Sequence, residues 1–354
     1  MRARGINFDT GFLSKGTSTR EPFDPEGVRR EMQIIRDDLH CSAVRITGGD
    51  PDRMEIAANH AAAAGLEVWF CPFTNGLTQD ELLDLLADCA ERAERLRQGG
   101  AHVVMLTGSE VSLFTSGFFP GETLEERLAL IADPLRVRAA VPEVRARMRD
   151  FLQRAVEIVR ARFGGPVSYA SLPLEGVDWL LFDIIATDAA YRTAATSPRY
   201  RELMRAFVEQ GRAQGKPVAI TEFGCGAHRG AGDEAGIGDS KIVWDDHARA
   251  VGLKGNYVRD EEEQATHVRE LLEVYDSEGI DAAFVYTFAR YNLPHRDASG
   301  IDLDMASAGI VKVLDDPAAA QDRRYPDMPW EPKAAFDTIA EFYGRSRGET
   351  THPG

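Results

Sequence analysis

Two glutamates stand directly after apolar runs and could act as a catalytic pair. Glu110 follows the segment MLTGS, and Glu222 follows the segment PVAIT. Cleavage of a glycosidic bond needs two carboxyl groups, one protonated to assist the leaving oxygen and one ionised to act as nucleophile or as base for water. A single glutamate after a strand is more often a helix cap or a partner for a surface arginine. The pair is informative only if the fold brings both glutamates to one place.

Eight short segments rich in valine, isoleucine and aromatic residues are the candidates for positioning this pair. Their apolar residues are mostly continuous rather than alternating, which is typical of parallel strands that are buried on both faces. The predicted strands are 4–9, 42–48, 66–73, 102–108, 166–171, 179–186, 217–222 and 282–289.

Helical patterns lie between most of these strands. Several begin with a capping residue followed by proline, as at Asp24, Asp50 and Ser197, and several end at glycine. Between the fifth and sixth strands only LPLEGVD intervenes, so the helix there is a single turn or absent. The predicted helices are 25–40, 51–64, 78–98, 141–163, 198–214, 260–278 and 331–344.

Eight strands that alternate with helices predict an α/β fold, a (β/α)8 TIM barrel, formed as a single domain over residues 1–354. A doubly wound sheet is the competing fold. It often has a glycine-rich phosphate turn after its first strand, and NFDTGFLSKG is no such turn. In a barrel, the ends of strands 4 and 7 face each other across the mouth, which would place Glu110 opposite Glu222.

Three connections are too long to be plain loops: 111–142 after strand 4, 224–259 after strand 7 and 290–330 after strand 8. All three follow the carboxyl ends of strands, where barrel enzymes hold their sites. We expect them to wall a pocket, although surface insertions are the alternative. Gly224 and Gly226 would let the chain turn sharply after Glu222.

Composition narrows the range of partners. The net charge of −16 disfavours nucleic acid and anionic membranes and suits a small neutral carbohydrate.

The N-terminal stretch has no apolar signal segment, and four scattered cysteines look like reduced thiols, so we expect a cytoplasmic protein. The eight histidines show no metal-binding spacing, and we predict neither metal nor cofactor. The loop 294–307, with His295, Asp297, Asp302 and Asp304, is interpreted as an ordered loop tied to Arg290 or Arg296.

The chain resembles the retaining glycoside hydrolases of the large (β/α)8 clan that includes β-galactosidases, β-mannanases and endoglucanases. The motif ITEFG is similar to the nucleophile strand of the clan, with Glu222 at the nucleophile position, and Glu110 matches the acid/base position on strand 4. In VRITG on strand 2, Arg45 resembles an arginine that orients the nucleophile. The likeness covers nearly the whole chain and points to no particular family.

Two positions depart from the clan pattern. The clan usually has asparagine directly before the acid/base, where it binds the sugar 2-hydroxyl, and this chain has the shorter Ser109. The clan often has tryptophan at the end of strand 8, and here Tyr286 or Phe288 would have to form the platform beneath the sugar. The first departure bears on the choice of sugar more than on the reaction.

The resemblance implies a division of roles that can be checked against pKa values. Glu222 must be ionised to attack the anomeric carbon, and Arg45 close by would hold the pKa of Glu222 down. Glu110 must be protonated, and a partly apolar site with the charge of Glu222 nearby would raise its pKa.

Other residues at predicted strand ends are candidate substrate ligands. Asn7 and Asp9 end strand 1, and each could equally be a turn or cap residue. The clan often keeps a tyrosine on the nucleophile. Tyr169 is the stronger candidate for this position and Tyr191 the weaker. Trp244, in the connection after strand 7, could form a subsite wall or simply pack locally.

These observations predict a retaining O-glycosyl hydrolase with Glu222 as nucleophile and Glu110 as acid/base, exo-acting on a small glycoside or oligosaccharide. The alternatives are a non-catalytic sugar-binding barrel, a transglycosidase with the same two glutamates and a metal-dependent isomerase or lyase. The sugar, the anomer, the linkage, endo or exo action and the oligomeric state stay open.

Overall fold

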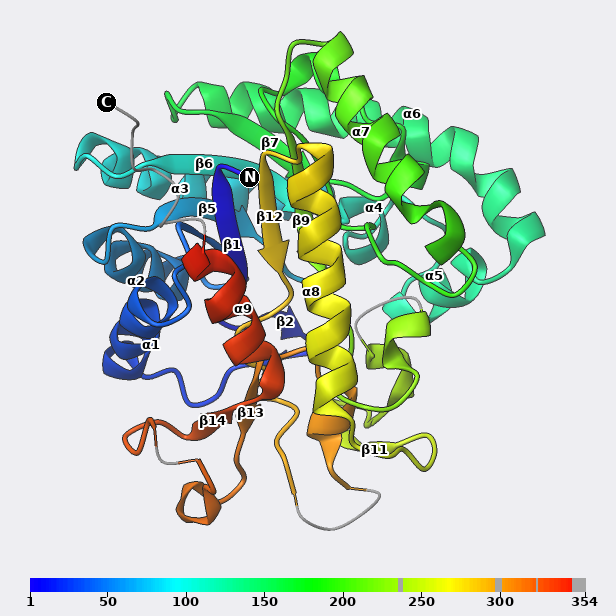
Figure 1. Cartoon of the computed structure of the whole chain (residues 1–354). Helices are drawn as coiled ribbons and strands as arrows, with labels where there is room; N and C mark the ends of the chain where they lie inside the picture. The colour runs from blue at the N-terminus through cyan, green and yellow to red at the C-terminus, as the bar shows by residue number, and fades with distance from the viewer. Residues whose placement is uncertain (235–237, 297–300, 323, 346–354) are drawn as a thin grey trace.

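The computed structural model describes residues 1–234, 238–296, 301–322 and 324–345 (Figure 1). Eight parallel strands form one sheet in the order β7-β6-β5-β4-β1-β12-β9-β8. The strands are β1 (Ala3–Asp9), β4 (Ala43–Gly48), β5 (Glu67–Pro72), β6 (Val103–Ser109), β7 (Val167–Ala170), β8 (Ile185–Thr187), β9 (Val218–Phe223) and β12 (Ala282–Val285).

The two edge strands β7 and β8 meet and close the sheet into a barrel. Ser171 and Thr187 form a parallel bridge, in which the Thr187 hydroxyl donates to the Ser171 carbonyl at 3.1 Å. The Ser168 hydroxyl donates to the Ile184 carbonyl at 3.0 Å. The predicted (β/α)8 barrel is therefore confirmed.

Helices surround the barrel in the predicted alternation (Figure 1). The side chains of Asp24 and Asp50 accept hydrogen bonds from first-turn amides, as their sequence pattern indicated. The helix expected at 141–163 begins earlier, because Asp133 caps it. Pro142, near the expected start, lies inside the helix. The helices are α1 (Pro25–Asp37), α2 (Pro51–Ala63), α3 (Gln79–Gln98), α6 (Pro134–Arg160), α7 (Tyr200–Ala213), α8 (Glu261–Glu278) and α9 (Ala334–Arg345).

The sixth strand is shorter than the sequence suggested. Of the predicted segment 179–186, Trp179–Leu181 forms a 3-10 turn, and the Asp178 side chain accepts the Leu180 amide at 3.0 Å. Asp183 lies at the surface and pairs with Arg160 at 2.9 Å. An apolar run with one carboxylate had looked like a continuous buried strand, but β8 begins only at Ile185.

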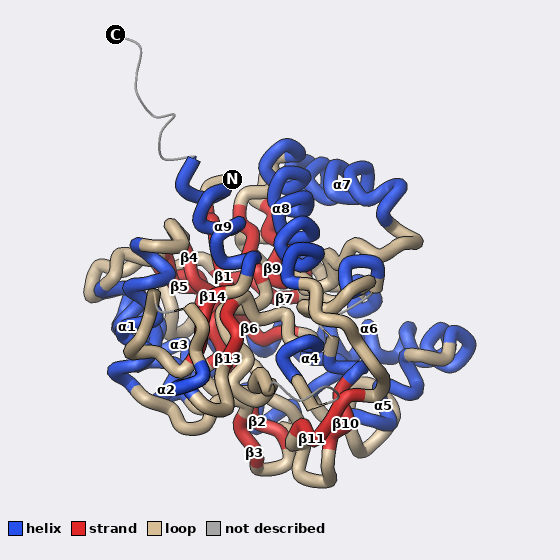
Figure 2. Tube along the Cα trace, turned by 60° about the horizontal axis from the view of Figure 1, so that its bottom comes forward, coloured by secondary structure: helices blue, strands red, loops and turns tan. Residues whose placement is uncertain are grey.

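The connections at the carboxyl ends of the strands carry small elements of their own, gathered on one face (Figures 1 and 2). After β1, an unpredicted hairpin of β2 (Leu13–Ser14) and β3 (Thr17–Ser18) projects there. Its Thr17 hydroxyl donates to the His247 carbonyl at 2.6 Å, and Lys15 pairs with Glu125 at 2.7 Å. The hairpin therefore ties the connections after β6 and β9 into one rim.

The remaining elements are short. They are α4 (Val111–Phe114) and α5 (Leu124–Ile131) after β6, the hairpin β10 (Ile242–Trp244) with β11 (Ala250–Leu253) after β9, β13 (Val311–Val313) with β14 (Trp330–Pro332) after β12, and the 3-10 turns η1 (Pro173–Glu175), η2 (Trp179–Leu181), η3 (Ser197–Arg199), η4 (Ala231–Asp233), η5 (Asp239–Lys241), η6 (Leu303–Ala306) and η7 (Pro317–Ala319).

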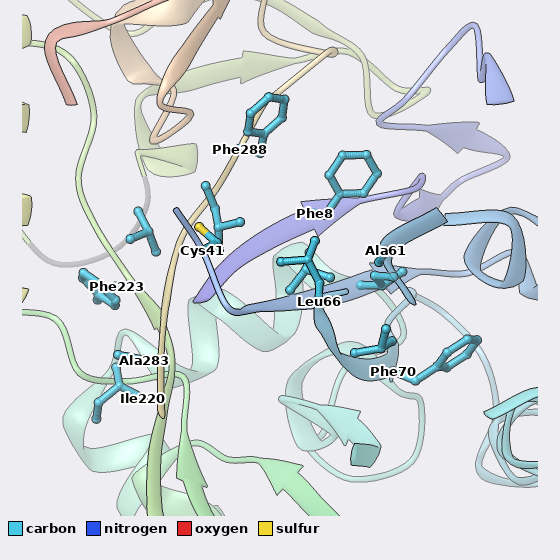
Figure 3. Close-up of a cluster of buried hydrophobic side chains, with 14 of the residues drawn as sticks. Phe8, Cys41, Ala61, Leu66, Phe70, Ile220, Phe223, Ala283 and Phe288 are labelled. Carbon is cyan, nitrogen blue, oxygen red and sulfur yellow. The ribbon is translucent and has the colours of Figure 1, made fainter. Parts of the chain in front are cut away.

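Two apolar layers hold the barrel. Inside it, the rings of Trp69 and Phe284 lie 4.8 Å apart, and a Cβ on Gly5 would come within 2.3 Å of the Phe284 ring. Phe8 and Phe288 belong to the larger layer between the sheet and the helices (Figure 3). Because side chains fill the barrel interior, the polar chemistry is confined to the strand ends. Among the described residues, we find no helix with the length and apolar character needed to cross a membrane.

Candidate active site

Arg45 is the centre of a buried polar cluster at the carboxyl end of the barrel. Its guanidinium Nη1 lies 3.0 Å from Glu222 Oε1 and 3.0 Å from Asp188 Oδ1. It also donates to Asn7 Oδ1 at 3.2 Å and to the Thr221 carbonyl at 3.1 Å. These partners come from β1, β9 and the residue after β8, so closure of the barrel assembles the cluster. One cation is shared by two carboxylates.

Glu222 lies near the end of β9 and is only 5% exposed. Burial, followed by the charge of Asp188, raises the pKa of Glu222 to about 8, against the lowering effect of Arg45 and of the hydrogen bond that Tyr191 donates at 3.3 Å. Arg45 lowers the pKa of Glu222, as expected, but burial and the charge of Asp188 outweigh its effect, so the pKa is raised rather than held down. Gly224 has φ +147°, and a Cβ there would lie 2.6 Å from the Tyr286 carbonyl, so the sharp turn after Glu222 requires glycine.

Glu110 directly follows β6 and directly precedes the four-residue helix α4. Its backbone is left-handed, with φ 46° and ψ 38°, and its amide donates to the Ala170 carbonyl at 3.0 Å. Burial, then the charges of Asp188, Glu222 and Glu175, raises the pKa of Glu110 well above its usual value, as expected for a proton donor.

Asp188 is a buried site residue that sequence reasoning missed. It directly follows β8, is fully buried, and accepts the Ser109 hydroxyl on Oδ2 at 2.6 Å. The available signal was an acid directly after the apolar run IIAT. The predicted sixth strand, 179–186, left Asp188 two residues beyond its end.

Three predicted ligand residues are engaged in holding the site together. Ser109 uses its hydroxyl proton on Asp188 and is 2% exposed. Asn7 is fully buried, donates to the Thr221 carbonyl at 2.9 Å and accepts from Arg45. Asp9 is a turn residue that accepts the amides of the next loop. Full burial makes Asn7 structural, so its predicted contact with substrate is wrong. Asp9 is half-buried, and its contact with substrate stays a prediction.

Of the two candidate tyrosines, the one that contacts Glu222 is Tyr191 and not Tyr169. Tyr191 reaches Glu222, whereas the fully buried Tyr169 directs its hydroxyl at Glu175 Oε1, 2.8 Å away. The preference for Tyr169 is wrong because its side chain lies on the helix α4 side of β7. Glu175 was also missed, because it stands in the short connection LPLEGVD and not at the end of a predicted strand.

The aromatic candidates separate by burial. Phe288 is fully buried, with its ring 6.2 Å from that of Phe8 and 5.3 Å from that of Trp330, so it cannot form a sugar platform. Tyr286 is half-buried after β12, with the Arg290 guanidinium 5.9 Å from its ring. Trp244 packs against a small apolar cluster that joins Ile242, after β9, to Leu293, Leu303 and Ala306, after β12. A platform at Tyr286 and a subsite wall at Trp244 stay predictions.

In the described part of the loop 294–307, the guanidinium that pairs with Asp302 and Asp304 is that of Arg259 rather than of Arg290 or Arg296. Arg259 lies 2.7 Å from Asp302 and 3.0 Å from Asp304, and buried Lys333 lies 2.9 Å from Asp304. Asp297 lies outside the described residues. In the described part of the chain, no group of three or more His, Cys, Asp and Glu side chains is arranged to hold a metal ion.

Comparisons with known proteins place the fold among glycoside hydrolases. No protein-family model and no curated protein sequence matches the chain. A solved GH113 beta-1,4-mannanase complex is 15% identical with a TM-score of 0.59, covering 97% of this chain and 99% of that one. The GH113 beta-mannanase AaManA of Alicyclobacillus acidocaldarius, in complex with ManMIm, is 16% identical with a TM-score of 0.58 and 97% of both chains covered.

A beta-glucuronidase of Parabacteroides merdae is 13% identical with a TM-score of 0.55, and the match covers 97% of this chain but 37% of that longer one. At such identities the likeness shows the fold. The barrel of this chain is thus one that these glycoside hydrolases share.

Proposed function

We propose that this protein is a retaining glycoside hydrolase with Glu222 as nucleophile and Glu110 as acid/base. The observation that carries the proposal is the position of Glu222, whose carboxylate is held by Arg45 and Tyr191. Burial and the charges of Asp188 and Glu222 raise the pKa of Glu110. The fold shared with solved mannanases and a glucuronidase supports the same class of reaction.

In the first step, ionised Glu222 attacks the anomeric carbon while Glu110 gives its proton to the leaving oxygen. Arg45 and Tyr191 hold the Glu222 carboxylate in place for this attack. Once the glycosyl ester forms, the charge of Glu222 is gone and the pKa of Glu110 falls. Glu110 can then take a proton from water, which hydrolyses the ester.

The charge balance of the site supports a neutral substrate. Glu222 and Asp188 share Arg45, and Glu110 and Glu175 add further carboxyl groups. An anionic sugar would therefore meet repulsion from ionised carboxylates. We propose a small neutral glycoside or oligosaccharide, cleaved from its end within the rim of connections that the β2–β3 hairpin joins.

A panel of nitrophenyl glycosides tests the proposal. On a glycoside that the wild type cleaves, Glu222→Gln should lose at least about a thousand-fold in kcat, the scale expected when a covalent catalyst is removed. Glu209→Gln, an exposed change on α7, is the control and should leave kcat unaltered. A 2-fluoro glycoside should add its sugar mass to the peptide that contains Glu222. Near-normal turnover in Glu222→Gln would contradict the assignment, and binding without turnover or labelling in the wild type would favour a sugar-binding barrel.

A further inference from the structure

The backbone just after β6 needs support that the short helix α4 cannot supply. Glu110 has the left-handed conformation that non-glycine residues rarely adopt, with φ 46° and ψ 38°. The helix that follows has only four residues, Val111–Phe114, and no side chain of its own caps it. The direction of the Glu110 side chain depends on this turn, so whatever holds the turn also aims the carboxyl group.

Tyr169 and Glu175 hold the turn through two consecutive amides. The Val111 amide donates to Tyr169 Oη at 2.9 Å, and the Ser112 amide donates to Glu175 Oε1 at 3.1 Å. Tyr169 Oη in turn donates to the same Glu175 oxygen at 2.8 Å. The other oxygen, Oε2, accepts the Leu172 amide at 2.8 Å. The carboxylate thus fastens the start of α4 to the loop after β7.

Glu175 also acts on Glu110 electrostatically. Its side chain is fully buried and its hydrogen-bond partners, one phenol and two amides, are all neutral. Burial raises the pKa of Glu175 to about 7, and its charge contributes to the raised pKa of Glu110. From β6 outward, Glu110 is faced by the charges of Asp188, Glu222 and Glu175, with Arg45 as the opposing cation.

We propose that Glu175, together with Tyr169, is a positioning residue for Glu110: it fixes the turn that aims the carboxyl group, and its negative charge helps to keep that group protonated. This inference rests on the proposed role of Glu110 as acid/base. Glu175 would thus act in two ways, by positioning the Glu110 carboxyl group and by its negative charge, and different substitutions can remove each effect.

Glu175→Gln removes the charge and keeps the size of the side chain. The pKa of Glu110 should fall, so the basic limb of the kcat/KM profile should move to lower pH by about half a unit or more. Tyr169→Phe removes one amide acceptor and keeps the Glu175 charge. It should lower kcat about ten-fold with little change in KM and leave the basic limb in place.

Glu331→Gln is the matched control. Glu331 is a buried glutamate that also accepts two backbone amides, from Gln321 at 2.7 Å and Asp322 at 2.9 Å, but it belongs to β14. Its substitution should lower the melting temperature without moving the basic limb. If Glu175→Gln moves the limb no more than Glu331→Gln does, the proposal is wrong.

The Glu110 carboxyl can also be titrated directly by carbon-13 NMR, with Glu110→Gln used to assign its signal. This measurement needs no substrate. If the wild type cleaves no glycoside but the pKa of Glu110 is still lower in Glu175→Gln than in the wild type, the proposed function is wrong. The electrostatic effect of Glu175 on Glu110 then still holds. Should Glu175→Gln not fold, Glu175→Asp keeps the charge but shortens its reach. In Glu175→Asp the basic limb of the kcat/KM profile should stay at the wild-type pH while kcat falls. An unchanged kcat would overturn the positioning role.

Discussion

Asp188 and Glu222 share one nitrogen of Arg45, each with a carboxylate oxygen 3.0 Å from Nη1. The guanidinium is buried, and it balances only one of the two negative charges. Because like charges nearby disfavour ionisation, Asp188 works against the cation that holds Glu222. Burial and the charge of Asp188, a residue that takes no part in the bond exchange, together raise the pKa of the proposed nucleophile.

Asp188→Asn should move the acidic limb of the kcat/KM profile to lower pH. Glu222 must be ionised to attack, and its pKa of about 8 falls when the charge of Asp188 is removed. The variant therefore stays active at pH values where the wild type is protonated. Asp183→Asn, which breaks a surface pair with Arg160, is the control and should leave the limb unmoved. An acidic limb that stays at the wild-type pH in Asp188→Asn, or moves to higher pH, would contradict this account.

Glu222→Gln should stabilise the protein more at high pH than at low pH. The pKa of Glu222 is about 8 in the folded state against an ordinary value of 4.5. Between these values the folded wild type binds more protons than the unfolded chain, so its stability falls as pH rises. The variant lacks this titration. Thermal denaturation at pH 5 and pH 9 should show a melting-temperature difference, variant minus wild type, that is larger at pH 9. A constant difference would rule this out.

Tyr191→Phe should reduce kcat/KM roughly ten- to hundred-fold, the range for losing a hydrogen bond to a charged group. The Tyr191 hydroxyl donates to Glu222 Oε2 at 3.3 Å and lowers the pKa of Glu222, so the acidic limb should also move upward. Tyr343→Phe removes a buried hydroxyl that donates to the Gly5 carbonyl at 3.2 Å, and serves as control. Equal effects of the two substitutions on kcat/KM would argue against a role at Glu222.

Glu110→Ala should slow cleavage of a glycoside with a poor leaving group by about 10²- to 10⁴-fold, the contribution of general acid catalysis. A good leaving group needs no proton and should be released nearly normally in the first step. Added azide, a nucleophile that needs no base, should restore turnover and give a glycosyl azide. Proton NMR should show the anomeric configuration of the substrate in that product. An inverted azide, or no response, would contradict the double displacement.

Lys333→Met should cost about 3 kcal/mol of unfolding free energy in urea, since it leaves the buried Asp304 without its nearest cation. Lys15→Met is the matched control. Lys15 pairs with Glu125 at the surface, both side chains being more than a third exposed, and its loss should cost less than about 1 kcal/mol. Similar costs for both variants would show that burial of the Lys333 pair adds nothing.

The barrel was predictable because its signals are local. Continuous apolar runs mark strands that are covered on both faces, and capping residues mark the helices between them. Alternation of the two then leaves few topologies. The same signals placed Glu110 and Glu222 at strand ends without knowledge of any contact.

The sixth strand shows where local signals fail. Trp179 to Leu181 are as apolar as a strand, yet Leu180 is 79% exposed in a 3-10 turn. Nothing within the segment states which of its residues will meet a neighbouring strand. The β2–β3 hairpin was missed for the opposite reason, because its two-residue strands are too short to form a pattern.

By itself, the sequence determined the strand order, the helices and the two glutamates at the mouth, because these depend on periodicity along the chain. Only the tertiary structure decided that Asp188 joins Arg45, that Tyr191 rather than Tyr169 reaches Glu222, and that Ser109 is bound to Asp188. These contacts join residues from different strands whose side chains meet only when β7 and β8 close the barrel. The pKa of Glu222 follows from the same contacts, since burial and opposed charges a few ångströms away leave no trace in a linear pattern.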